Sequence, residues 1–70
     1  MKTVNITTEY ITLGQMLKFA GIINSGALAK TFLIENEVYV NHELEQRRGR
    51  KLYDSYVVTA LGKEYLIEKK

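Results

Sequence analysis

The sequence predicts a small α+β fold, because the spacing of its apolar residues changes from helical to strand-like near the middle of the chain. Between Thr12 and Asn36, apolar residues recur three and four positions apart, which is typical of helices. From residue 38 onward they alternate with polar residues, which is typical of strands. No proline and no low-complexity stretch divides the chain. We therefore expect residues 1–70 to form one domain, with a short strand, two helices and three to five further strands.

The first strand and the first helix follow from local patterns. Val4 and Ile6 alternate with polar neighbours, which predicts a short, half-buried strand. Thr12 and Gln15 have the spacing of a capping box, in which each side chain bonds a backbone N–H at the start of a helix. Gly21 is placed to end this helix in a left-handed conformation. The expected apolar stripe consists of Leu13, Met16, Leu17 and Ala20, and Lys18 falls outside it.

The second helix is predicted to begin at Asn24-Ser25, since both residue types are good N-caps. Apolar residues cover more than half of the circumference over residues 27–34, so we expect this helix to be mostly buried. Gly26 and Lys30 lie four residues apart on what remains of its polar face. Asn36 is predicted to end the helix in a left-handed conformation.

The second half of the chain reads as short strands joined by turns. Three pairs of turn-forming residues are predicted to connect them, at Asn41-His42, Asp54-Ser55 and Gly62-Lys63. Strands are expected at residues 38–40, from Leu44, at Leu52, at residues 56–58 and at residues 65–67. This order favours hairpins, and hence antiparallel pairing.

The positive charge of the chain is concentrated in one place. The net charge is +2, yet residues 1–46 hold three Lys against five Glu, and the charges of residues 52–70 sum to zero. All of the excess therefore comes from residues 47–51, with the sequence RRGRK, which we call the basic segment. A solvated loop is the simplest interpretation. Four cations this close repel one another, however, and a polyanion relieves that repulsion.

Few residues suit catalysis, and we do not expect an enzyme. A chain of 70 residues buries only about 60% of its unfolded surface, which leaves little room for an enclosed active site. It has one histidine, His42, and no cysteine, so we expect neither a metal centre nor a cofactor. Glu43 and Glu45 are a candidate acid–base pair, but we expect them to form ion pairs with Arg47 and Arg48 instead.

Nucleic-acid binding suits the residues better. The helix start at Ser25 would present backbone N–H groups to a phosphate, with Gly26 offering no obstruction and Lys30 one turn further along. The arginines of the basic segment supply forked donors for phosphates and base edges. We assign no tyrosine as a platform for bases, and we expect core or sheet-surface positions for Tyr39, Tyr53, Tyr56 and Tyr65.

The order of these features resembles the S4 RNA-binding domain. A helix ending at Gly21 is followed by the sequence NSGA at residues 24–27 and by VYVNHELEQRRGRKL at residues 38–52. The resemblance covers residues 11–60 and is greatest to short, stand-alone bacterial S4-like proteins. It implies a two-helix αL motif packed on a small, mainly antiparallel sheet. Many S4 domains have arginine where this chain has Gly26, and glycine where it has His42.

The resemblance also implies a function and a site. The chain would bind structured RNA, ribosomal or transfer, without catalysis, and would meet the ribosome or other RNA-associated proteins. The lack of cysteine and of an apolar run of about 20 residues favours a cytoplasmic chain that associates with no membrane, and we expect a monomer. The site residues carried over by position are Lys18, Ser25, Gly26, Lys30, Asn41, Arg47, Arg48, Arg50 and Lys51. Replacing the three arginines together by Ala is expected to abolish RNA binding without unfolding the chain. A protein-interaction adaptor and a DNA-binding module, using the same basic surface, remain the alternatives.

Overall fold

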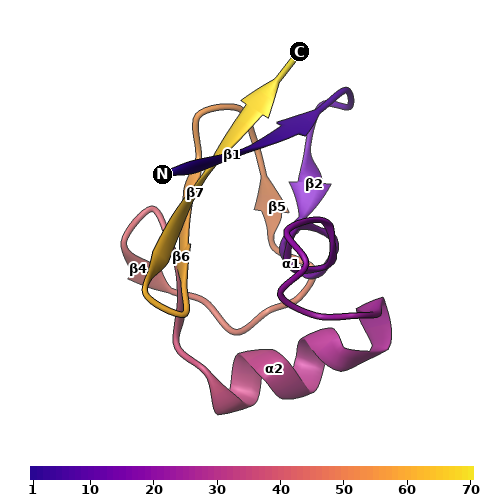
Figure 1. The fold of residues 1–70 in the computed structure, drawn as a ribbon, viewed down its shortest axis with the longest axis vertical. Coiled ribbons are helices and arrows are strands. Elements are labelled where there is room, and N and C mark those ends of the chain that lie inside the picture. The colour runs from indigo at the N-terminus through magenta and orange to yellow at the C-terminus, as the bar shows by residue number, and fades with distance from the viewer.

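The computed structural model describes residues 1–70 and confirms an α+β fold, in which two short helices pack against a small sheet (Figure 1). The strands are β1 (Lys2–Ile6), β2 (Ile11–Thr12), β3 (Val38–Val40), β4 (Glu43–Leu44), β5 (Lys51–Leu52), β6 (Val57–Ala60) and β7 (Lys63–Lys69). The helices are α1 (Leu13–Phe19) and α2 (Ala29–Glu35), and a single 3-10 turn, η1 (Gly26–Leu28), precedes α2.

The main sheet is mostly antiparallel. Its strand order is β1-β7-β6-β3-β4, and only the pair of β1 with β7 is parallel, with Lys2 opposite Tyr65 and Ile6 opposite Lys69. β2 and β5 form a separate two-stranded ribbon, in which Ile11 lies opposite Leu52. The first and last strands of the chain are thus neighbours. Their pairing joins the two ends of the sequence, which no local pattern predicts.

The core is built from alternate residues of the strands and one stripe of each helix. Alternation on a strand places every second side chain on the same face of the sheet, and these side chains are the buried ones. The buried apolar residues are Val4, Ile6, Ile11, Leu13, Met16, Leu17, Ile23, Ala29, Leu33, Val38, Val40, Leu52, Val58, Ala60, Tyr65 and Ile67. One continuous cluster therefore joins the sheet, the ribbon and both helices.

α1 begins and ends as the sequence predicts. Gln15 N–H donates to Thr12 Oγ1 over 3.3 Å, and the Gln15 side chain accepts from the Thr12 N–H over 3.1 Å, which confirms the capping box. Gly21 has φ +76°. Its N–H donates to the Lys18 carbonyl, and Ile22 N–H donates to the Leu17 carbonyl, both over 3.0 Å. These two bonds form a Schellman motif, which satisfies carbonyls left free at the helix end.

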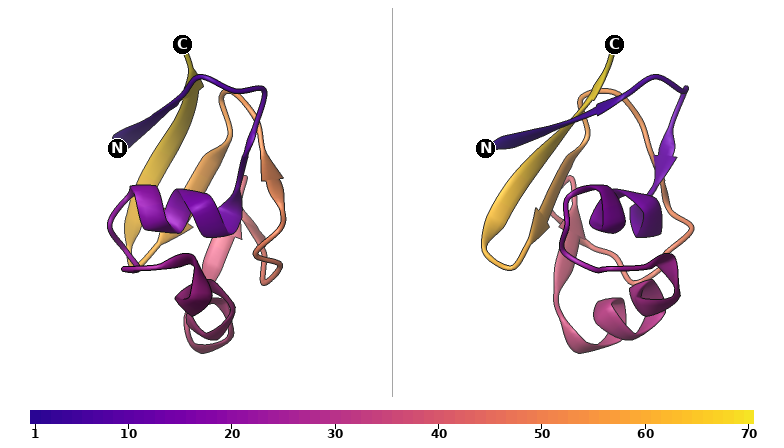
Figure 2. Two further views of the ribbon diagram at one scale, coloured as in Figure 1. Left: turned by 90° about the vertical axis from the view of Figure 1, so that its right-hand side faces the viewer. Right: turned by 45° about the vertical axis from the view of Figure 1, so that its right-hand side comes forward.

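α2 differs from the prediction of a mostly buried helix. It lies at one end of the molecule, beyond α1 (Figure 2), and only Ala29 and Leu33 are buried. Ile34 is 66% exposed, because α2 has a neighbour on one side only. The left-handed cap at Asn36 is also wrong, since Asn36 has an extended backbone and its side-chain N–H donates to the Phe32 carbonyl over 3.1 Å. No helix has the length and apolar character needed to cross a membrane.

The turns between strands are close to those predicted. Asn41 and His42 both have positive φ, 50° and 71°, and connect β3 to β4 in a tight two-residue turn. Ser55, with φ 72°, confirms the turn at Asp54-Ser55. The last turn is wrong by one residue: Leu61 and Gly62 form it, because Ala60 already pairs with Lys63. This register leaves two residues to connect β6 to β7. Both of them, Leu61 and Gly62, have a left-handed backbone conformation.

Candidate nucleic-acid interface

The basic segment is fixed on the start of α1. The N–H groups of the first helical turn have no partners within the helix. Leu13 N–H donates to the Arg50 carbonyl over 2.8 Å, and Gly14 N–H donates to the Arg48 carbonyl over 2.9 Å. Gly14 permits this approach, since an added Cβ would lie 3.3 Å from Ala29 Cβ and 3.4 Å from the Arg48 carbonyl oxygen. Three segments far apart in the sequence therefore meet at Gly14.

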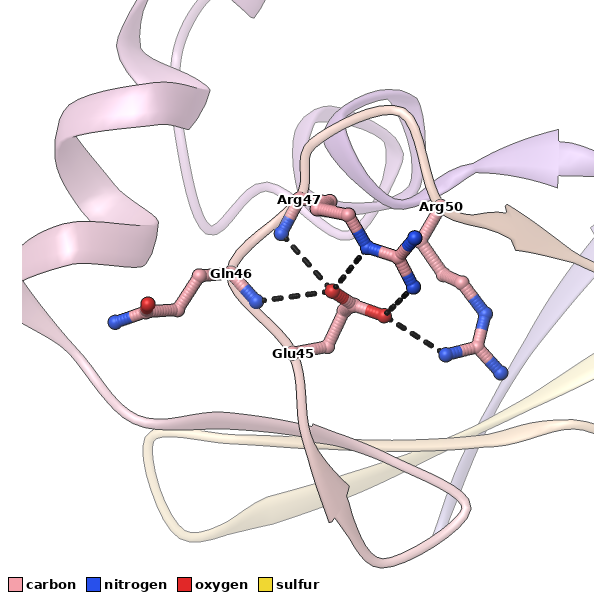
Figure 3. A network of polar contacts seen from close by, with 4 residues as sticks. All are labelled: Glu45, Gln46, Arg47 and Arg50. Carbon is pink, nitrogen blue, oxygen red and sulfur yellow. Dashed lines mark hydrogen bonds and ion pairs between the residues drawn. The ribbon is translucent and has the colours of Figure 1, made fainter.

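The buried carboxylate of Glu45 also fixes the basic segment, through hydrogen bonds and ion pairs (Figure 3). Glu45 is 6% exposed and is the only charged residue in the interior. Its Oε2 accepts from Arg47 Nε over 3.0 Å and from the backbone N–H groups of Gln46 and Arg47, both over 3.1 Å. Its Oε1 accepts from Arg47 Nη2 over 3.0 Å and from Arg50 Nη1 over 2.8 Å. Every oxygen of Glu45 is thus satisfied by the segment that follows it.

These bonds explain the acidity of Glu45. The Arg47 side chain makes the largest contribution, and with Arg50 and the Arg47 backbone N–H it lowers the pKa of Glu45 from 4.5 to about 2, against the opposing effect of burial. Glu45 in turn raises the pKa values of the Arg47 and Arg50 guanidinium groups. The cluster is therefore fully ionised at neutral pH.

The predicted ion pairs are only partly correct. Glu45 pairs with Arg47, as expected, but its second partner is Arg50 rather than Arg48, and Glu43 forms no ion pair. The cause is a turn within the basic segment: Arg50 N–H donates to the Arg47 carbonyl over 3.2 Å, which returns Arg50 to the side of Arg47. Arg48 is exposed and pairs with no carboxylate.

A shallow groove separates the basic segment from η1. Its volume is about 380 Å³, and we call it the helix–loop groove; it is lined by Thr12, Gly14, Gln15, Gly26, Ala29, Arg48 and Gly49. The start of the second helix and the basic segment, which the resemblance implied to form one surface, thus face each other across this groove. Gly26 and Arg48 are the predicted site residues that it brings together.

Ser25 does not act as the predicted helix cap. It occupies the N-cap position with an extended backbone, φ −150° and ψ 157°, but its side chain makes no capping hydrogen bond. The residues after it form the 3-10 turn η1, in which Leu28 N–H donates to the Ser25 carbonyl over 3.1 Å, and α2 itself begins only at Ala29. The start of this helix therefore offers a weaker, less aligned set of dipoles than a regular α-helix would.

Three predicted site residues belong neither to the helix–loop groove nor to the basic segment. Lys18 is exposed on α1 and lines a separate hollow of about 470 Å³. Lys30 is exposed on α2. Asn41 stabilises the sheet: its N–H donates to the Val57 carbonyl over 2.8 Å, and its Oδ1 accepts from the Val57 N–H over 2.9 Å. The side-chain oxygen of Asn41 is thus already bonded within the protein.

A cluster of tyrosines that the sequence did not predict lies beside the basic segment. Tyr53 and Tyr56 lie between β5 and β6, outside any strand, whereas Tyr65 is buried as expected. The rings of Tyr10 and Tyr53 have centroids 5.8 Å apart, and those of Tyr53 and Tyr56 are 5.7 Å apart. Lys51 Nζ lies 4.9 Å from the Tyr10 centroid. The pairing of β2 with β5, a contact between distant residues, brings Tyr10 to this aromatic cluster.

The structure contains no cluster of side chains suited to hold a metal ion. No three side chains of His, Cys, Asp or Glu lie close enough together to hold a metal ion. His42 is exposed in the turn between β3 and β4. Glu45, the one buried carboxylate, is already bonded to Arg47 and Arg50.

Comparison with known proteins agrees with the resemblance in the sequence. A sequence family described as the S4 domain matches residues 4–68, which is nearly the whole chain. The probable ribosome maturation protein RlbA of Bacillus subtilis (strain 168) is 58% identical to this chain over 59 residues. The aligned part covers 84% of this chain and 83% of that protein.

Proposed function

The chain belongs to the S4 domain family, and from this membership we propose that it is a non-catalytic protein that binds structured RNA. Its B. subtilis relative is named a probable ribosome maturation protein, which favours ribosomal over transfer RNA as the ligand. The same relationship favours action in the cytoplasm, on ribosomal particles, and we propose that the chain acts there as a monomer.

The observation that carries the proposal is the state of the basic segment. It holds four cations, and Glu45 is the one carboxylate bonded to them, so the cluster keeps a net charge of +3 (four minus one). Arg48 and Lys51 pair with no carboxylate. Guanidinium and ammonium groups exposed in this way are the usual partners of phosphate oxygens.

The rigidity of the segment supports the same proposal. Two hydrogen bonds from α1 fix its backbone before any ligand arrives, together with five bonds to Glu45, of which four come from Arg47 and Arg50 and one from the Gln46 backbone N–H. A preorganised loop loses less conformational freedom on binding, which raises affinity for a given set of contacts. Recognition by a fixed array of charges suits a folded RNA, whose phosphates are also held in place.

Fluorescence anisotropy with labelled hairpins tests the proposal. The probes are a ribosomal RNA hairpin, a transfer RNA and a DNA hairpin of the same sequence as the first. We expect the ribosomal hairpin to bind most tightly, and its affinity to fall about 40-fold between 50 and 200 mM salt if three phosphates are contacted. Equal affinity for the DNA hairpin would contradict a preference for RNA, and an affinity indifferent to salt would contradict contacts with phosphates.

A pull-down separates RNA binding from a role as a protein adaptor. The tagged chain is recovered from a bacterial lysate before and after complete digestion by ribonuclease. We expect ribosomal proteins to be recovered only from the undigested lysate, because RNA connects them to the chain. A protein partner retained at the same level after digestion would contradict the proposal.

A further inference from the structure

The aromatic cluster (Tyr10, Tyr53 and Tyr56) plays no part in the phosphate contacts described above. Two of its rings, Tyr53 and Tyr56, border a hollow of about 390 Å³ beside the basic segment, which we call the aromatic hollow; it is lined by Arg47, Gly49, Arg50, Lys51, Tyr53 and Tyr56. Every lining residue is cationic, aromatic or glycine. The hollow therefore combines flat apolar rings with positive charge at its edge.

The three rings differ in what covers their faces. Lys51 Nζ lies over Tyr10, and the Arg50 guanidinium carbon lies 6.0 Å from the Tyr56 centroid. Tyr53 has no cation over it, and its plane is tilted by 53° from that of Tyr10 and by 66° from that of Tyr56. Tyr53 is 37% exposed, it lines the hollow, and neither neighbour stacks on it in parallel, so Tyr53 is the ring of the three best placed to receive another flat group.

We propose that the aromatic hollow is a subsite for one unpaired RNA base, which stacks on Tyr53 while Lys51 and Arg47 bind its phosphate. This inference rests on the proposed RNA binding and adds a second kind of contact, to a single-stranded nucleotide beside the folded part of the ligand. Base–aromatic stacking next to a cationic groove is the usual way in which proteins hold unpaired nucleotides.

The charges around the hollow favour a nucleotide. Glu45 directs both oxygens to Arg47 and Arg50, and Asp54 Oδ1 accepts the backbone N–H of Lys69 over 2.8 Å, so neither carboxylate faces an incoming phosphate unpartnered. Arg47 uses Nε and Nη2 for Glu45, which leaves Nη1 free, and its side chain is 75% exposed. An anion attached to a flat ring matches this arrangement.

The experiment compares three RNA probes that differ only in their unpaired part. The first is a blunt 12-base-pair RNA duplex, the second carries five unpaired adenosines at both ends of one strand, and the third replaces those adenosines by abasic riboses. We expect the adenosine probe to bind five- to 150-fold more tightly than the abasic probe, which has the same phosphates. Equal affinities for these two probes would overturn the inference without any change to the protein.

Substitutions at Tyr53 locate the effect. Tyr53→Phe should keep the gain in affinity from adenosines, and Tyr53→Leu should lose it while binding the blunt duplex as the parent chain does. Tyr39→Leu, a tyrosine of β3 outside the hollow, is the matched control and should keep the gain. Retention of the full gain by a folded Tyr53→Leu chain would overturn the inference. Should that variant not fold, as judged by circular dichroism, the abasic comparison alone decides.

The two proposals fail in different ways. A chain that binds the blunt duplex but gains nothing from adenosines keeps the proposed RNA binding and loses the base subsite. A chain that binds neither duplex nor ribosomal hairpin loses both.

Discussion

The basic segment consists of two pairs of cations that share a sequence context and differ in their surroundings. Arg47 and Arg50 bond the buried carboxylate of Glu45, whereas Arg48 and Lys51 meet no carboxylate at all. Arg48 also contributes its carbonyl to the start of α1, so its backbone is fixed while its side chain remains exposed. The first pair therefore stabilises the loop, and Arg47 keeps only Nη1 free of Glu45, whereas the second pair is free of carboxylates and is the one that we propose to be the main contact of the RNA.

This division shows why a count of charges overstates the binding surface. Removing one partner from a buried ion pair leaves an uncompensated charge and strongly destabilises a protein, whereas an exposed cation can be removed at little energetic cost. The triple replacement of the arginines by Ala would therefore also remove both partners of Glu45. If that variant lost RNA binding, the loss could result from unfolding of the chain as readily as from the missing contacts with RNA.

The largest effect on stability is expected at Glu45. Glu45→Gln keeps the shape of the side chain but removes the charge that Arg47 and Arg50 share, so we expect the free energy of unfolding to fall by about 3 kcal/mol. Urea denaturation followed by circular dichroism measures it. Glu43→Gln is the matched control, because Glu43 is exposed and forms no ion pair, and it should change stability by less than about 0.5 kcal/mol. Equal losses of stability in the two variants would contradict a special role of Glu45 in holding the basic segment.

Acid should produce the next largest effect through the same group. The folded pKa of Glu45, about 2, lies below its ordinary 4.5. The stabilisation is therefore fully present above pH 4.5 and is lost as pH falls through about 2. We expect the parent chain to lose about 2 kcal/mol relative to Glu45→Gln between pH 5 and pH 3. Asp54, whose pKa is also lowered by the Lys69 backbone N–H, contributes equally to both chains. If the difference in unfolding free energy between the parent chain and Glu45→Gln stayed constant from pH 5 to pH 3, the lowered pKa of Glu45 would be contradicted.

A smaller effect distinguishes the two arginines that bond Glu45. The side chain of Arg50 is 26% exposed and that of Arg47 is 75% exposed, so solvent replaces the contact of Arg47 more easily. Arg50→Gln is expected to lower the free energy of unfolding by about 1 kcal/mol, and Arg47→Gln by less. Thermal melts of the two variants, side by side, give the order. The reverse order would show that the contact of Arg47 matters more than its exposure suggests.

Features set by neighbouring residues could be predicted from the sequence. The capping box of Thr12, the left-handed Gly21 and the turn at Asn41-His42 each depend on a few consecutive residues, and all three are confirmed. The alternation that places Val38 and Val40 in the core is also local. The family resemblance supplied the overall arrangement of helices and sheet.

Features that depend on distant contacts could not be predicted. The apolar pattern of α2 gave no sign that the helix packs on one side only, which leaves Ile34 in solvent. The choice of Arg50 over Arg48 as a partner for Glu45 follows from a turn inside the basic segment, and the aromatic cluster follows from the pairing of β2 with β5. The four cations of the basic segment could be counted from the sequence. Which of them bond Glu45, and which stay exposed without a carboxylate partner, could not be predicted.

The most direct test of this division is the salt dependence of RNA affinity after the free cations are removed. The double variant Arg48→Gln, Lys51→Gln is compared with Lys2→Gln, Lys63→Gln, which loses the same charge from exposed residues of β1 and β7. We expect the first variant to bind a ribosomal RNA hairpin at least tenfold more weakly, with the slope of log affinity against log salt reduced by about 2 and stability unchanged. The control should keep the parent slope. Equal slopes for the two variants would contradict the assignment of Arg48 and Lys51 to the ligand.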